Sequence, residues 1–193
     1  MTVSAEARGT RAFTLVELLI VLAIIIILAG LIMSTSGYVQ KKGARSRAEA
    51  EIAALSAAIE SYKADNGIYP RDDTGAKASD MLDPRMEGNP ANYKASSLYL
   101  YSQLSGRNAD GTNITGAKSY FTFKPQMMNG ARDASGNVNP VTGIRDPFGN
   151  NYGYSTANQA DPTKGYNPTF DLWSTGGTTS GSATDRLQWV KNW

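Results

Sequence analysis

The sequence contains no cysteine and no histidine in its 193 residues. These absences exclude disulfides, thiol chemistry, imidazole metal ligands and the most common general base. A hydrolase would have to depend on Asp and Glu alone, and no constellation of carboxylates stands out in the sequence. We therefore expect that the protein is not an enzyme.

Charge is also scarce, because 19 Lys and Arg residues and 17 Asp and Glu residues leave a formal net charge of only +2. The basic residues are scattered except for Arg8, Arg11 and a group within residues 41–47. No basic face of the size that nucleic acid requires is evident, so nucleic acid is not an expected partner. The length allows one domain of about 100–150 residues and an additional anchor.

The sequence does contain one long apolar run, Phe13–Met33. As a helix it would be about 31 Å long, which matches a bilayer core of about 30 Å. Arg8 and Arg11 precede this run, so the positive-inside tendency places residues 1–12 in the cytoplasm and the remainder outside. A cleaved secretory signal would have a shorter apolar core. We therefore expect a single membrane-spanning helix over residues 13–33.

Glu17 is the single charged residue in this apolar run. An acid costs up to about 2.5–3.5 kcal/mol at the centre of a membrane helix and less near its end, and it usually has a partner. Glu17 therefore either reaches the cytoplasmic interface or pairs with another group.

Residues 11–19, with the sequence RAFTLVELL, resemble the processing signature of type IV pilins and of the pseudopilins of type II secretion. In that family a prepilin peptidase cuts before the Phe on the cytoplasmic side and methylates the new amino terminus. The resemblance implies cleavage between Ala12 and Phe13, and N-methylation of Phe13. The family usually has Gly where this chain has Ala12.

The processed chain would carry a cationic amine on Phe13, about one helical turn from Glu17. In a low-dielectric setting each of these charges needs an opposite charge. We expect Glu17 of one subunit to pair with the Phe13 amine of another, so that the charge pair sets the register while the apolar surfaces supply adhesion.

Proline is absent between Phe13 and Ile68, which predicts one helix over residues 13–65. Its outer part, within residues 34–66, is amphipathic, and Asn66-Gly67 is a C-terminal cap. We expect its apolar stripe to face the core: Ile52, Leu55, Ile59 and Tyr62.

Residues 67–193 are expected to form one periplasmic domain. The pattern predicts a short helix over residues 95–104 and strands over residues 120–124, 152–155 and 170–174, separated by Gly-, Asn- and Pro-rich loops that include residues 71–94 and 107–116. The expected fold class is α+β, with the long helix packed on a small antiparallel sheet as in pilins.

Asp146-Pro147-Phe148-Gly149, the segment from Phe170 to Gly176, and Lys191-Asn192-Trp193 are similar to the major pseudopilin of type II secretion. The first motif also has a local explanation, because Asp146 can accept turn N–H groups, Pro147 fixes φ and Gly149 supplies a positive φ.

The resemblance implies a filament of identical subunits in the periplasm. Its implied partners are an inner-membrane secretion platform, minor pseudopilins and secreted proteins that it drives across the outer membrane. The alternative is a type IV pilin for adhesion, motility or DNA uptake.

The resemblance further implies a calcium ion in the C-terminal loop, where many type IV pilins instead have a disulfide. Residues 176–185 offer oxygen ligands from Thr178, Ser180, Asp185 and backbone carbonyls. However, an acid of the family falls at Gly177-Thr178, where this chain has no carboxylate. A calcium site with an incomplete ligand set and a loop held by packing alone remain the two alternatives.

Overall fold

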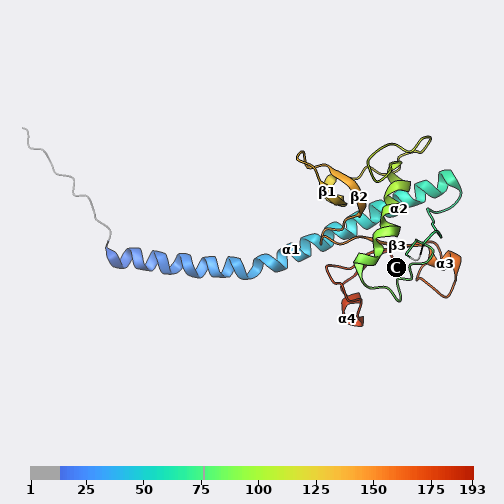
Figure 1. The fold of residues 1–193 in the computed structure, drawn as a ribbon. Helices are drawn as coiled ribbons and strands as arrows, with labels where there is room; N and C mark the ends of the chain where they lie inside the picture. The colour runs from blue at the N-terminus through green and yellow to red at the C-terminus, as the bar shows by residue number, and fades with distance from the viewer. Residues whose placement is uncertain (1–13, 76) are drawn as a thin grey trace, which may run out of the picture. The chain divides into compact units, whose positions relative to one another are not determined.

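One long helix, α1, spans Leu15–Asn66. The computed structural model describes residues 14–75 and 77–193, with the backbone alone for residues 32–36. The chain divides into two units, Met1–Lys42 and Gly43–Trp193, and α1 runs through both (Figure 1). The predicted helix over residues 13–65 agrees with α1, except that residue 13 lies outside the described residues.

The end of α1 is the predicted glycine cap. Gly67 has a φ of +77°, and its N–H donates to the Lys63 carbonyl over 2.8 Å. Glycine adopts this left-handed conformation without the steric cost that a Cβ would impose. The side-chain amide of Asn66 adds a bond to the Tyr62 carbonyl.

The predicted apolar stripe of α1 lies in the core of the second unit. Ile52, Leu55 and Ile59 are buried, and Tyr62 is partly buried. The same hydrophobic cluster contains residues of the sheet and of the second helix, including Tyr154, Leu172, Val190, Leu100 and Leu104. Burial of this stripe is what fixes the outer part of α1 to the rest of the unit.

Three short strands form the antiparallel sheet beside this core, in the order β3-β4-β5. They are β3 (Gly153–Ser155), β4 (Asp171–Ser174) and β5 (Val190–Lys191). Gly153 lies opposite Trp173, and a Cβ at Gly153 would come within 2.2 Å of the Trp173 ring. The predicted strands over 152–155 and 170–174 are confirmed, whereas β5 is absent from the prediction.

The helix predicted over residues 95–104 is α2, Lys94–Ser105, which contacts β3 and a further strand, β2 (Val138–Ile144) (Figure 1). A 3-10 turn, η1 (Pro90–Tyr93), leads into it, and Gly106 ends it with a φ of +68°. Two further helices are single turns: α3 (Ala157–Ala160) and α4 (Ala183–Arg186).

The prediction of a strand over residues 120–124 is wrong. The N–H groups of Tyr120 and Phe121 both donate to the Leu104 carbonyl at the end of α2, so this segment caps a helix instead of pairing with a strand. A β-hairpin forms later in the chain, after η2 (Pro125–Met127). Its two antiparallel strands are β1 (Met128–Arg132) and β2 (Val138–Ile144).

Polar contacts tie the connection between α1 and α2 to Thr156, the residue after β3. We call residues 71–75 and 77–89 the α1–α2 connection. Arg71 forms a 2.6 Å ion pair with the buried Asp80, and the other oxygen of Asp80 accepts the Thr156 hydroxyl over 2.6 Å. Together these elements form an α+β architecture, as predicted. A long N-terminal helix and a small antiparallel sheet are consistent with a pilin-like fold.

Candidate functional site

The first candidate site is the beginning of α1, where Thr14 and Glu17 cap the helix reciprocally. The Glu17 N–H donates to the Thr14 hydroxyl over 3.2 Å. In return, Oε2 of Glu17 accepts the Thr14 N–H over 2.9 Å and the Thr14 hydroxyl over 2.8 Å. This arrangement is a capping box, which satisfies N–H groups that a helix start leaves unpaired.

Thr14 is absent from the sequence-based prediction, although Thr-x-x-Glu before an apolar run is a signature of a helix start. Ala12 and Phe13, the predicted cleavage and methylation residues, lie outside the described residues. The proposed pairing of Glu17 with a Phe13 amine therefore stays a prediction.

The first half of α1 exposes its apolar side chains. Every described side chain from Thr14 to Leu31 is exposed, with fractions from 50% at Ile24 to 80% at Leu15 for the large apolar residues. A surface that is apolar all around a helix is usually covered by lipid or by protein.

Among the described residues, no helix combines the length and the apolar character needed to cross a membrane. The predicted membrane-spanning segment, residues 13–33, extends beyond the described side chains at both ends.

Asp146 organises the turn that precedes β3. Its Oδ1 accepts the N–H groups of Phe148 and Asn150 over 3.0 and 2.8 Å, and Gly149 adopts a φ of +97°. Its Oδ2 accepts the Ser174 hydroxyl over 2.5 Å, which links the turn to β4. Burial raises the pKa of Asp146, although these donors oppose the effect by stabilising the carboxylate.

The C-terminal loop, residues 175–185, contains the three side chains predicted as calcium ligands. Ser180 donates both its hydroxyl and its N–H to Oδ2 of Asp185. Thr178 is not part of this contact, because its hydroxyl donates to the Thr175 carbonyl over 2.8 Å. Ser182 accepts the Asp185 N–H and caps α4.

Arg186, the last residue of α4, contacts this loop and is absent from the sequence-based prediction. Its Nε donates to the Gly181 carbonyl over 2.8 Å, and its second donor contacts the Pro84 carbonyl in the α1–α2 connection. Its guanidinium lies 4.6 Å from the centre of the Trp189 ring. No local sequence signal could have identified it, since Pro84 is distant in the chain.

The donor set of this loop does not fit a calcium ion. Calcium prefers six to eight oxygen ligands, among them carboxylates. Asp185 is the single carboxylate of the loop, and its Oδ2 accepts the Ser180 hydroxyl. Across residues 14–75 and 77–193, no group of three or more Asp or Glu side chains is placed to hold a metal.

A family model and curated proteins both match this chain. The model of the prokaryotic N-terminal methylation motif matches residues 7–33. A type II secretion system core protein G from Pectobacterium carotovorum subsp. carotovorum is 31% identical over 136 residues, which are 67% of this chain and 85% of the relative. A protein of the same name from Dickeya chrysanthemi is 27% identical over 150 residues, 76% of this chain and 97% of the relative. No solved structure matches.

Proposed function

The chain belongs to the family of type II secretion system core protein G, and we propose that it polymerises through α1 into the pseudopilus that drives protein export across the outer membrane. The N-terminal methylation motif is typical of pilin-like subunits. The relatives carry the name of a secretion component, so the alternative, a type IV pilin for adhesion, motility or DNA uptake, is not favoured.

The observation that carries the proposal is the exposed apolar surface of α1 from Leu15 to Leu31. Removing apolar surface from water contributes roughly 25 cal/mol per Å², so such a helix needs lipid or other copies of itself as its surroundings. In the membrane, lipid covers this surface before assembly. In the filament, the same surfaces of neighbouring subunits cover one another.

Glu17 would set the register of that packing. A carboxylate has about four acceptor positions, so the cap of Oε2 to Thr14 is compatible with a bond from the Phe13 amine of a neighbouring subunit. A charge-assisted hydrogen bond of this kind is about twice as strong as a neutral one. It would therefore favour one axial offset over the others that the apolar surface alone allows.

The remaining partners follow from the same assembly. A prepilin peptidase would cleave between Ala12 and Phe13 and methylate Phe13. The subunit would lie in the bacterial inner membrane with its N-terminus in the cytoplasm and residues 67–193 in the periplasm. From there an inner-membrane platform and minor pseudopilins would build the filament that acts on secreted proteins. The role is structural and not enzymatic.

The proposal can be tested by expressing the protein with its secretion system and isolating sheared filaments. Mass spectrometry of the filament subunit is expected to show an N-methylated Phe13 as the first residue. Unprocessed subunits in the filament, or a processed protein that forms no filament, would contradict the proposal.

A further inference from the structure

The family resemblance implies a metal ion in the C-terminal loop. In this chain a positive charge, Arg186, follows directly after that loop. Between Ser174 and Leu187 the charged residues are Asp185 and Arg186, so one negative and one positive charge cancel. A divalent cation binds where carboxylates are in excess. The loop therefore lacks the electrostatic attraction that such an ion requires.

Arg186 connects two segments of the chain that are distant in sequence. Its guanidinium bridges the Gly181 carbonyl of the loop and the Pro84 carbonyl of the α1–α2 connection. A planar guanidinium supplies several donors in a fixed geometry and remains protonated at all ordinary pH values. It can therefore hold two carbonyls from separate segments as a bound ion does, without being lost on dilution.

The aromatic surroundings favour this position of the guanidinium. The guanidinium lies over the ring of Trp189, which is buried and stacks on Trp173 at 6.0 Å. A cation over a tryptophan face is stabilised by the ring quadrupole. The Arg186 side chain is thus held from three sides by the loop, the connection and the core.

The backbone of the loop lies directly against the α1–α2 connection. A Cβ at Gly88 would come within 2.1 Å of the Gly181 Cα, so the two backbones can approach this closely only with glycine. The connection is itself fixed to the core, because the buried Tyr93 donates to the Glu87 carbonyl and packs against Trp173. The loop therefore packs on a segment that is itself held against the core.

We propose that Arg186 holds the C-terminal loop in place of a metal ion, so that the subunit keeps its folded loop without calcium. If the subunit forms a filament as proposed above, this filament should assemble without calcium. The role of Arg186 in holding the loop does not depend on the proposed function.

The first test uses the full-length wild-type protein in detergent micelles. Thermal unfolding and amide hydrogen exchange of residues 176–185 are measured with EDTA and with added calcium chloride. We expect the same melting temperature and the same exchange rates under both conditions. A lower melting temperature or faster loop exchange in EDTA would overturn the proposal.

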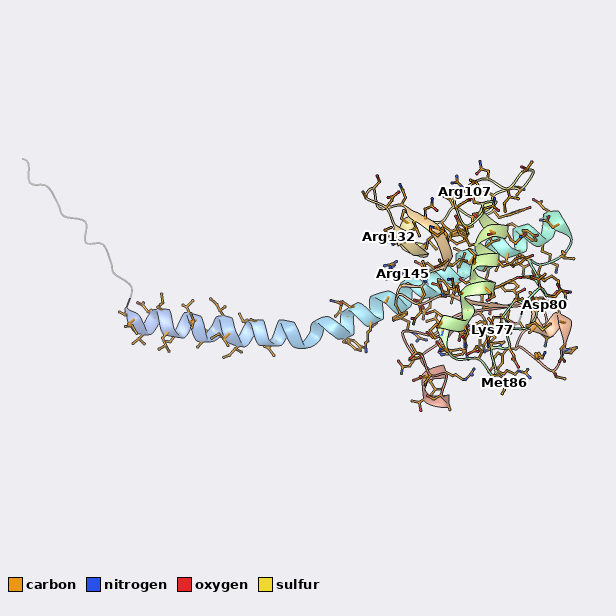
Figure 2. The ribbon with its side chains drawn as sticks, in the orientation of Figure 1. Lys77, Asp80, Met86, Arg107, Arg132 and Arg145 are labelled. Carbon is orange, nitrogen blue, oxygen red and sulfur yellow. The ribbon has the colours of Figure 1, made fainter. Side chains whose placement is uncertain are left out.

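The second test compares Arg186→Gln with Arg132→Gln. Arg132 is a matched control because it also donates to two carbonyls, those of Gly136 and Pro125, and it lies in the hairpin, well apart from Met86 in the connection (Figure 2). We expect Arg186→Gln to accelerate exchange in residues 176–185 and 84–88 by about tenfold or more, since hydrogen bonds from a charged donor are lost. Arg132→Gln should leave both segments unchanged.

Arg186→Lys keeps the charge but not the forked donor, so an exchange rate between those of wild type and Arg186→Gln is expected. This variant and the wild-type EDTA measurement decide the question if Arg186→Gln does not fold. Recovery of loop protection in Arg186→Gln on adding calcium would overturn the proposal. Equal exchange rates of residues 176–185 in Arg186→Gln and Arg132→Gln would also overturn it. All these measurements use the isolated subunit, so a failure of the secretion assay would leave their result unaffected.

Discussion

Oε2 of Glu17 accepts both the backbone N–H and the hydroxyl of Thr14 at the first turn of α1. The side chain proposed to set the filament register therefore also caps the helix within its own subunit. A loss of assembly in a position-17 variant could arise from either role. The two roles can be separated by the choice of substitution.

Glu17→Gln is expected to keep the cap and lose the charge, because glutamine also serves at this position of a capping box. Glu17→Ala loses both. We expect both variants to be processed by the peptidase and both to yield few filaments. Filament yield is measured from sheared cells by immunoblot, and a wild-type yield from Glu17→Gln would show that capping, and not charge pairing, is what assembly needs.

Thr14→Val removes the hydroxyl at nearly constant volume and leaves the Glu17 N–H without its acceptor. Loss of an N-cap side chain costs about 1 kcal/mol, so exchange of the first-turn amides of α1 should increase about fivefold in micelles. Thr14→Ser keeps the hydroxyl and serves as the control. Identical protection in the two variants would mean that the cap contributes nothing to the helix start.

Gly88→Ala is expected to destabilise the contact between the α1–α2 connection and the C-terminal loop. The added Cβ would overlap the Gly181 backbone, and overpacking of this kind costs about 1–3 kcal/mol. Gly75→Ala is the matched control, since nothing lies within 4 Å of its added Cβ. Denaturant unfolding of both variants measures the difference, and equal stabilities would refute the contact.

Asp146 should make the free energy of unfolding depend on pH. Burial raises its pKa above the ordinary value of 3.8, so this carboxylate binds a proton more tightly in the folded protein than in the unfolded chain. Its contribution is fully present below the unfolded pKa and is lost as the pH rises through the folded pKa. The free energy of unfolding of wild type relative to Asp146→Asn should therefore increase as the pH falls from about 7 to about 4.

Ser174→Ala should move this transition to higher pH, because the Ser174 hydroxyl is a donor that stabilises the carboxylate. Denaturant titrations at several pH values measure both effects. A stability difference between wild type and Asp146→Asn that is independent of pH would contradict the burial argument.

The elements set by local patterns could be predicted from the sequence. The extent of α1 follows from the missing proline and the spacing of Ile52, Leu55 and Ile59, and its end follows from Gly67. The strands β3 and β4 follow from their aromatic residues between turn formers. In each case the information lies within a few residues of the element.

The elements set by distant contacts could not be predicted. The segment 120–124 alternates like a strand, but the rings of Tyr120 and Phe123 pack on Tyr62 of α1 and Tyr101 of α2. The hairpin strands contain Asn, Gly and Pro, which weaken any strand signal.

The two candidate sites differ in the same way, because one depends on a local pattern and the other on a contact between distant residues. The N-terminal motif is continuous in sequence, and the cap between Thr14 and Glu17 follows a known local pattern. The C-terminal loop depends on Arg186 reaching the Pro84 carbonyl, a contact that only the folded chain defines. The calcium ion that the resemblance implies for this loop stays a prediction, whereas the contacts of Arg186 are visible only in the folded chain.

The central claim, that this subunit builds a secretion pseudopilus, is tested most directly by exoprotein release. A strain that lacks the gene is complemented with the wild-type protein or with Glu17→Gln, and the secreted protein in the culture medium is measured alongside twitching motility. The account predicts that the wild type restores release, that Glu17→Gln does not, and that twitching is unaffected throughout. Normal release from the deletion strain together with a loss of twitching would contradict it.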